Sequence, residues 1–86
     1  MASYEIEISR TAERQLKKLA GEDQPRVVRA LLALAEEPRP RNSRKLTGYD
    51  DVSRIGVGRF RVLYSVSDTR LVILVLKIGH RKDVYR

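Results

Sequence analysis

Residues 52–78 have the sequence VSRIGVGRFRVLYSVSDTRLVILVLKI, which predicts three consecutive β-strands. Each predicted strand is rich in β-branched and aromatic residues and is bounded by turn-forming residues. We expect these strands at 52–57, 59–66 and 71–78. The residues SDTR form the hairpin turn between the last two strands, and Gly79 is expected to end the third.

Upstream of this stretch, the apolar pattern changes from alternation to helical spacing. Residues 4–8 (YEIEI) alternate and predict a half-buried strand. A first helix is expected to begin after Ser9, a suitable N-cap, and to end near Gly21. A second helix should carry Pro25 in its first turn and end at Pro38. The short connection between the two predicts a helical hairpin.

The order β-α-α-β-β-β predicts an α+β fold with one domain over residues 1–86. In this fold an N-terminal strand and a helical hairpin accompany a three-stranded antiparallel sheet. Residues 38–47 (PRPRNSRKLT) are polar, basic and proline-bearing, so we expect an exposed loop there, followed by a turn at 48–51. The helices should cover one face of the sheet, which leaves the other face without a partner in the chain.

Positive charge is concentrated in the second half of the chain. Residues 38–86 hold twelve lysines and arginines against four acids, whereas residues 1–37 hold six against seven. The two parts therefore carry +8 and −1, which together give the net charge of +7. This imbalance favours a polyanionic partner, with nucleic acid as the leading candidate. An acidic protein, an anionic membrane surface, or a purely solubilising role are the alternatives.

Several classes of site are excluded by composition. With no cysteine and one histidine, the chain has no disulfide framework, no thiolate chemistry and no metal-ligand spacing. We therefore expect neither a metal nor another cofactor. The longest apolar run, 71–76, is too short to span a bilayer, and the N-terminus lacks a secretory signal. The absence of cysteine suits a reducing cytoplasm.

The alternation of side chains along a strand assigns basic residues to a face. Between residues 59 and 66, one side holds Phe60, Val62, Tyr64 and Val66. This apolar side should meet the helices, so Arg61 should point away from them. In the preceding strand, Arg54 is opposite in phase to Ile55. Arg54 is therefore also expected on the uncovered face.

The last strand has apolar residues on both faces. Lys77 is in phase with Ile73 and Val75 and opposite to Ile78. Depending on the register, each of the three strands can still place one cation on the uncovered face: Arg54, Arg61 and Lys77, with Arg81 closing the groove at the end of the last strand. Arginine grips phosphate oxygens in two places, so such a groove suits phosphate. The alternative is that these are ordinary solvated strand residues.

Gly56 and Gly58 flank Val57 immediately before the second strand of this stretch. Glycines at such positions favour a bulge or a tight hairpin, and the hairpin is the preferred interpretation. They could also let a ligand approach the backbone closely. The pattern does not predict a phosphate-cradling loop, because no GK[ST] sequence and no helix follow.

Two segments, RIGVGRFRVLY (54–64) and IGHRKDVYR (78–86), resemble the RelE/ParE superfamily. These proteins are toxins of bacterial and archaeal type II toxin–antitoxin pairs. The resemblance covers nearly the whole chain, includes the KLTG turn at 45–48, and favours the RelE branch. It implies a RelE-like fold and a small ribonuclease that cuts mRNA in the ribosomal A site by attack of a ribose 2′-hydroxyl, without a metal.

The resemblance also implies roles for individual residues. Arg61 matches the arginine that contacts the scissile phosphate, and Arg81 matches the one that stabilises the transition state. Tyr85 matches the tyrosine that orients the reacting nucleotide or stacks on a base. Arg54 matches a cation that binds phosphate or serves in proton transfer. Gly56 is a departure, because many members have a second basic residue there as the candidate general base.

Other residues complete the expected site. His80 is the only side chain whose unperturbed pKa lies near neutrality, so His80 or Lys77 could compensate for the missing base. The expected RNA-binding residues are Lys77, Arg59, Lys45, Arg44 and Arg41, and Arg39 lies in the same basic loop. The loop cations are expected to contact ribosomal RNA backbone.

The partners that the resemblance implies are the ribosome, mRNA and a RelB-like antitoxin with an acidic segment that covers the basic groove. The antitoxin could lay a helix or an extended segment across the sheet or the helical hairpin. No membrane partner is expected. Two alternatives remain: a ParE-like inhibitor of DNA gyrase without RNA chemistry, and a catalytically degenerate RNA-binding homologue, which Gly56 would suit.

Overall fold

The structure, a computed structural model, describes residues 3–82. Its elements follow the chain in the order β1 (Glu5–Ile8), α1 (Arg10–Lys18), α2 (Asp23–Glu36), β2 (Arg44–Lys45), β3 (Val52–Val57), β4 (Phe60–Ser67) and β5 (Val72–His80). The predicted order and α+β class are confirmed. Neither helix within residues 3–82 is long and apolar enough to cross a membrane.

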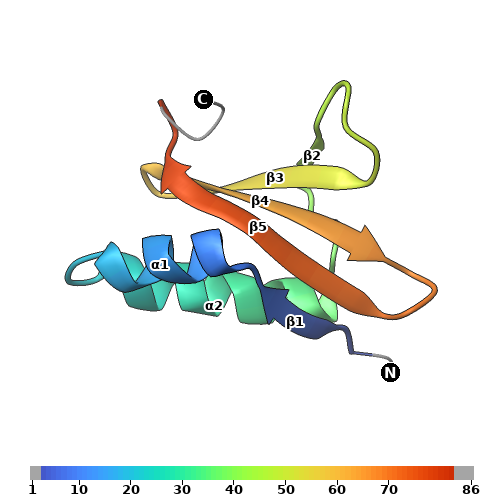
Figure 1. Cartoon of the computed structure of the whole chain (residues 1–86), viewed down its shortest axis with the longest axis horizontal. Helices are drawn as coiled ribbons and strands as arrows, with labels where there is room; N and C mark the ends of the chain where they lie inside the picture. The colour runs from blue at the N-terminus through green and yellow to red at the C-terminus, as the bar shows by residue number, and fades with distance from the viewer. Residues whose placement is uncertain (1–2, 83–86) are drawn as a thin grey trace.

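The sheet has five strands in the order β1-β5-β4-β3-β2. β1 runs parallel to β5, and the other neighbours are antiparallel. The three antiparallel strands predicted within residues 52–78 are therefore correct, but the sheet has a further strand at each edge: β1 beside β5 and β2 beside β3. β2 lies inside the segment 38–47 that was expected to be loop; a strand of two residues leaves no alternating pattern to detect. Figure 1 shows both helices on one side of this sheet.

The helices begin and end close to the predicted positions. Ser9 caps α1, because its Oγ accepts a hydrogen bond of 3.0 Å from the N–H of Ala12. α1 ends at Lys18, earlier than the expected stop at Gly21, and Gln24 Nε2 donates to the carbonyl of Leu16 at 3.1 Å. That bond satisfies one of the carbonyls exposed at the end of a helix.

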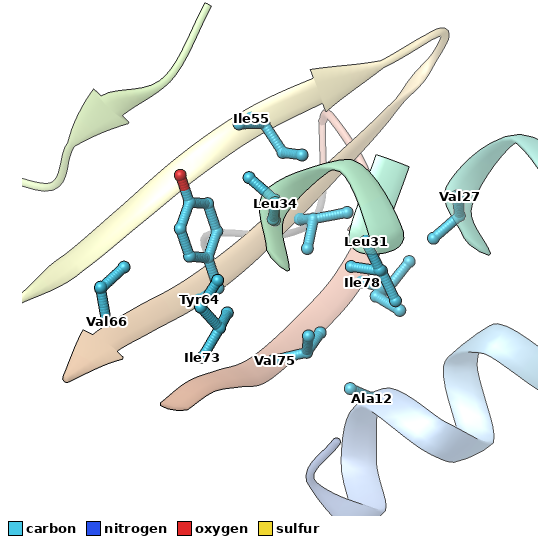
Figure 2. Close-up of a cluster of buried hydrophobic side chains, with 11 residues drawn as sticks. Ala12, Val27, Leu31, Leu34, Ile55, Tyr64, Val66, Ile73, Val75 and Ile78 are labelled. Atoms are coloured by element: carbon cyan, nitrogen blue, oxygen red, sulfur yellow. The ribbon is translucent and has the colours of Figure 1, made fainter. Parts of the chain in front are cut away.

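The hydrophobic core lies between the helices and one face of the sheet (Figure 2). Its largest side chain is Tyr64, which is 0% exposed. The hydroxyl of Tyr64 donates a 2.7 Å hydrogen bond to the carbonyl of Pro38. Burial raises the pKa of Tyr64, which keeps the hydroxyl protonated and able to donate. The other buried members of this core are Ala12, Val27, Leu31, Leu34, Ile55, Val62, Val66, Ile73, Val75 and Ile78.

A β-bulge in β5 decides which residues of that strand enter the core. Leu63 pairs with Lys77 but Tyr64 pairs with Val75, so Leu76 is the extra residue. As a result Val75 and Ile78, three positions apart, are both buried. Lys77 lies opposite Leu63, on the face away from the helices. Plain alternation put Lys77 in phase with Val75, and the bulge reverses this.

Ser9 and α1 satisfy backbone groups of β5 that lie beyond the end of β1. β1 pairs with β5 only as far as Val75. Beyond that point, Ser9 Oγ donates to the carbonyl of Leu76 at 2.9 Å, and the N–H of Ile78 donates to Gln15 Oε1 at 2.7 Å. These two bonds fix α1 against the edge of β5.

The ends of the last two hairpins differ in part from expectation. Gly58 has φ = 60° and lies in the two-residue connection between β3 and β4, as the hairpin interpretation predicts. Glycine takes this conformation without the steric penalty of other residues. The expectation that Gly79 ends the last strand is wrong, because Gly79 pairs with Arg61 and the strand continues to His80.

Replacing Gln15 by alanine should destabilise the fold, because it removes the hydrogen bond between α1 and β5 beside the bulge. The variant leaves the N–H of Ile78, a residue that is 1% exposed, without its acceptor. We expect the free energy of unfolding to fall by about 1–3 kcal/mol, measured by urea denaturation. Gln15→Glu keeps an acceptor oxygen and is the matched control. Equal losses in the two variants would contradict this role of Gln15.

Candidate nucleic-acid interface

The face of the sheet that the helices leave uncovered, here called the open face, carries a row of cations. Residues directly opposite each other in an antiparallel pair share a face. Arg54 pairs with Leu63 and Leu63 pairs with Lys77, so the three lie in one row across β3, β4 and β5. Arg44 of β2 pairs with Arg54 and extends the row. Neighbouring strands are about 4.8 Å apart, so Arg54 and Lys77 leave the sheet about 10 Å apart.

Arg61 stands in the next row of the open face, about 7 Å further along β4. Its partners on the two flanking strands are Gly56 and Gly79. A Cβ atom built on Gly56 would lie 2.9 Å from Arg61 Nη1, so the guanidinium lies over the backbone of β3. The glycine that departs from the family pattern therefore leaves the space that Arg61 occupies.

Arg59 and Arg81 lie at the same end of the sheet as Arg61. The N–H of Arg81 donates a 3.0 Å hydrogen bond to the carbonyl of Arg59, which joins the segment after β5 to the β3–β4 hairpin. Both residues are exposed. The structure thus brings Arg59, Arg61 and Arg81 to one end of the sheet, although they come from two separate parts of the chain.

The structure does not bring His80 to this face. His80 pairs with Phe60, which is in phase with the buried Val62, so His80 lies on the helix side of β5. Its ring contacts Phe60 edge-to-face with 6.0 Å between centroids, and its Nδ1 accepts a 3.4 Å hydrogen bond from the N–H of Lys82. Tyr85, the remaining expected catalytic residue, lies outside the described residues.

The cations of the loop before β3 have different surroundings. Arg44 Nη1 donates to the carbonyls of Arg41 and Ser43 at 3.3 and 3.1 Å, so this side chain holds the loop together. Lys45 pairs with Ser53, on the other face from Arg44. Arg41 and Lys45 are exposed. Only part of the expected RNA-binding loop therefore shares the open face.

Arg39 forms a structural contact that the sequence did not indicate. Its guanidinium binds both carboxylate oxygens of Asp68 at 3.1 and 3.0 Å, and the Tyr4 hydroxyl donates to the same carboxylate at 2.6 Å. The bonds from Arg39 and then Tyr4 hold the pKa of Asp68 below its usual value, and the bond to Asp68 raises the pKa of Tyr4. This cluster ties β1, the loop after α2 and the β4–β5 turn together.

The arginines at the open face differ from Arg39 in having no carboxylate partner in the described part of the chain. Within residues 3–82, Arg54, Arg59, Arg61 and Arg81 form no ion pair. No group of histidine and acidic side chains in that part of the chain could hold a metal ion. Arg54 and Arg61 are fixed on strands, whereas Arg59 and Arg81 lie in the turns next to β4 and β5. Guanidinium groups without internal ion pairs that strands hold in place can bind the phosphates of a polyanion in a defined geometry.

Substituting Gly56 tests whether it determines where the Arg61 side chain lies. The Cβ of Gly56→Ala would displace the guanidinium from β3, so we expect the Nε–Hε NMR signal of Arg61 to shift. The fold should tolerate the change, because only the end of a flexible side chain has to move. Ser65→Ala, two rows from Arg61 along the open face, is the control. An unchanged Arg61 signal in Gly56→Ala would contradict the close approach.

The chain is similar to known toxins in sequence and in fold. Residues 6–85 match the family described as the ParE toxin of the type II toxin–antitoxin system, parDE. The chain is 32% identical to toxin RelG of Mycobacterium tuberculosis, over 96% of this chain and 97% of that protein. It is 30% identical, with a TM-score of 0.83, to a chain of the archaeal RelE–RelB complex from Pyrococcus horikoshii OT3, over 95% and 99% of the two chains. A chain of the intact E. coli RelBE complex gives 26% identity and a TM-score of 0.80, over 91% and 96%.

Proposed function

Since this chain belongs to the RelE/ParE superfamily and is the toxin of a RelBE-like type II pair, we propose that it is an endoribonuclease that cuts mRNA in the ribosomal A site. It would act in the cytoplasm and block translation. The observation that carries the proposal is the set of arginines on the open face. Arg54 and Arg61 project from adjacent strands, and neither pairs with a carboxylate within residues 3–82.

The proposed reaction is attack of a ribose 2′-oxygen on the adjacent 3′-phosphate. A bond forms between the 2′-oxygen and phosphorus while the bond from phosphorus to the 5′-oxygen breaks. The products are a 2′,3′-cyclic phosphate and a 5′-hydroxyl end. Arg61 and Arg81 would stabilise the charge that builds on the phosphoryl oxygens, where one such donor contributes about 10²–10³ in rate. Binding the strand in line for attack supplies a further part of the rate enhancement.

A proton must leave the 2′-hydroxyl and another must reach the 5′-oxygen. Gly56 provides no side chain for this step. Lys77 and His80 are the two candidates to replace the missing general base. Lys77 shares the open face with Arg54, whereas His80 lies on the helix side against Phe60. We therefore propose Lys77 for proton transfer, Arg54 as a donor to phosphate oxygens, and Tyr85 for base stacking. Positioned proton transfer of this kind contributes about 10²–10⁴ in rate.

An inhibitor of DNA gyrase is the second candidate, because the matching family is described as the ParE toxin. Such a protein would act by binding and would not need the arginines for chemistry. A degenerate homologue that binds RNA without cutting it is the third, since Gly56 removes a cation that many relatives have. Supercoiling inhibition without mRNA cleavage would favour the second candidate.

Alanine substitution of Arg61 or Arg81 should abolish most of the cleavage. We expect each variant to lower kcat by about 10²–10³, because each removes one donor to the developing charge. The measurement is mapping of mRNA 5′ ends by primer extension in a reconstituted translation reaction. Arg70→Ala, which removes a cation from the exposed β4–β5 turn, is the control and should cleave normally. Full cleavage by the Arg61 and Arg81 variants would contradict the mechanism.

The antitoxin partner is expected to use two kinds of surface. An acidic segment would neutralise the open face, and an apolar segment would cover the exposed side of α2. There Leu32 is 62% exposed and Val28 is 38% exposed, one turn apart. Aliphatic side chains presented at this spacing suit a helix or an extended segment laid across the hairpin.

Replacing Leu32 by glutamate should weaken the complex with the antitoxin. The side chain is exposed, so the fold should tolerate the change. A charge buried in an apolar contact should raise Kd about tenfold or more, mainly through faster dissociation. The measurement is surface plasmon resonance with the co-encoded antitoxin. Arg29→Gln, on the same exposed side of α2, is the control; an unchanged Kd for Leu32→Glu would show that the antitoxin docks elsewhere.

A further inference from the structure

α1 carries a second cationic surface. The net charge of residues 1–37, which is −1, gives no sign of it. Its four cations are all exposed, and none has a hydrogen bond or ion pair within residues 3–82: Arg10, Arg14, Lys17 and Lys18. At about 100° per residue they fall within an arc of about 100°. The arc lies opposite Ala12, which is 0% exposed in the core. We call this set of four residues the α1 band.

The acids that balance the charge of residues 1–37 lie elsewhere in the fold. Within α1 only Glu13 is acidic, and it stands at the margin of the α1 band, beside Arg10 and Arg14 in a shallow hollow of about 320 Å³. The others lie on β1 and at the two ends of α2: Glu5, Glu7, Glu22, Asp23, Glu36 and Glu37. A part of the chain that is near neutral overall therefore presents a strongly basic helix face.

The α1 band opposes the local stability of its own helix. Arg10 is the first residue of α1, where the helix dipole disfavours a cation. The pairs Arg10–Arg14 and Arg14–Lys18 are like charges four residues apart, which repel. The dipole favours only Lys17 and Lys18, in the last turn. Local conflicts of this kind are expected where a residue serves function, and a polyanion would relieve the repulsion.

The chemistry of the α1 band suits phosphate better than a protein surface. Protein interfaces are depleted of charge at their centre and enriched in aromatic residues. No large apolar side chain of α1 is exposed, whereas α2 exposes Leu32 and Val28. From Arg10 to Lys18 the α1 band is about 12 Å long, at about 1.5 Å per residue. That length lets its cations reach several successive phosphates of one strand.

We propose that the α1 band binds the phosphate backbone of a structured RNA and is a docking surface separate from the open face. α1 lies on the helix side of the sheet (Figure 1). The α1 band and the open face therefore point in different directions. Resting on the proposed function, the inference is that α1 anchors the toxin on ribosome-borne RNA while the open face holds the strand that is cut. The α1 band thus determines binding of the ribosome and not the chemical step.

The test is the variant R10Q/R14Q/K17Q/K18Q of the full chain. Its affinity for a fluorescent RNA hairpin is measured by anisotropy over a series of salt concentrations. We expect the slope of log Kd against log salt to fall by about 3, close to one for each phosphate that the variant no longer neutralises.

In the mRNA cleavage reaction on ribosomes we expect KM to rise at least tenfold while kcat stays unchanged. Glu13→Gln, on the same helix, is the control and should bind as tightly or more tightly. Cooperative thermal unfolding with a Tm no lower than that of the wild type establishes that the quadruple variant folds.

The outcomes separate this inference from the proposed function. A quadruple variant with unchanged salt slope and unchanged KM overturns the inference, even if the wild-type protein cleaves mRNA. A wild-type protein that does not cleave mRNA removes the proposed function, and the hairpin titration still decides the inference. Loss of antitoxin affinity with intact RNA binding would make the α1 band a protein interface and would also overturn it.

Discussion

The bulge at Leu76 is the constraint on which the rest of the structure depends. It lets Val75 and Ile78 both enter the core while Lys77 points to the other face. Without the extra residue, plain alternation would bury Lys77 in an apolar interior, where an unpaired ammonium group is very unfavourable. The bonds from Ser9 and Gln15 complete the edge of β5 beside the bulge, because they satisfy backbone groups of Leu76 and Ile78 that lie beyond the end of β1.

The helices cover only one face of the sheet, so charged side chains can lie on the other face. The fully buried apolar residues of β3, β4 and β5, among them Ile55, Tyr64 and Ile73, lie on the helix side. The other side carries cations together with partly buried residues such as Leu63 and Leu74. Arg54 and Arg61 are held by strand geometry at fixed spacing, unlike arginines on flexible loops. Arg39, which looks equivalent in the sequence, is instead neutralised by Asp68. Position in the fold, and not residue type, separates a cation without an ion pair within residues 3–82 from one that a carboxylate neutralises.

Much of this fold could be predicted from the sequence. Strand 52–57 has the predicted bounds, because its alternation is regular and Gly58 marks the turn. Arg54 and Arg61 were assigned to the correct face for the same reason. β2 was missed because two residues make no pattern, and the strand through Gly79 was cut short because pairing with Arg61 overrides the preference of glycine.

What could not be predicted depends on contacts between distant parts of the chain. The bulge leaves no mark in the sequence of β5, so the position of Lys77 followed only from the pairing register. The cluster of Tyr4, Arg39 and Asp68 joins three segments with no shared motif. The basic face of α1 was hidden in an average over residues 1–37. The roles of Arg81, Tyr85 and the other candidate site residues remain predictions.

The parallel pairing of β1 with β5 has a consequence for how the molecule is made. Glu5 pairs with Val72, so the first strand is synthesised long before its partner emerges from the ribosome. Contacts between such distant segments form slowly, because closing the long loop between them costs entropy before the contacts stabilise the chain. The sheet cannot be completed while the nascent chain is still short. The sheet is therefore assembled only after both its first strand, β1, and its last, β5, have been synthesised.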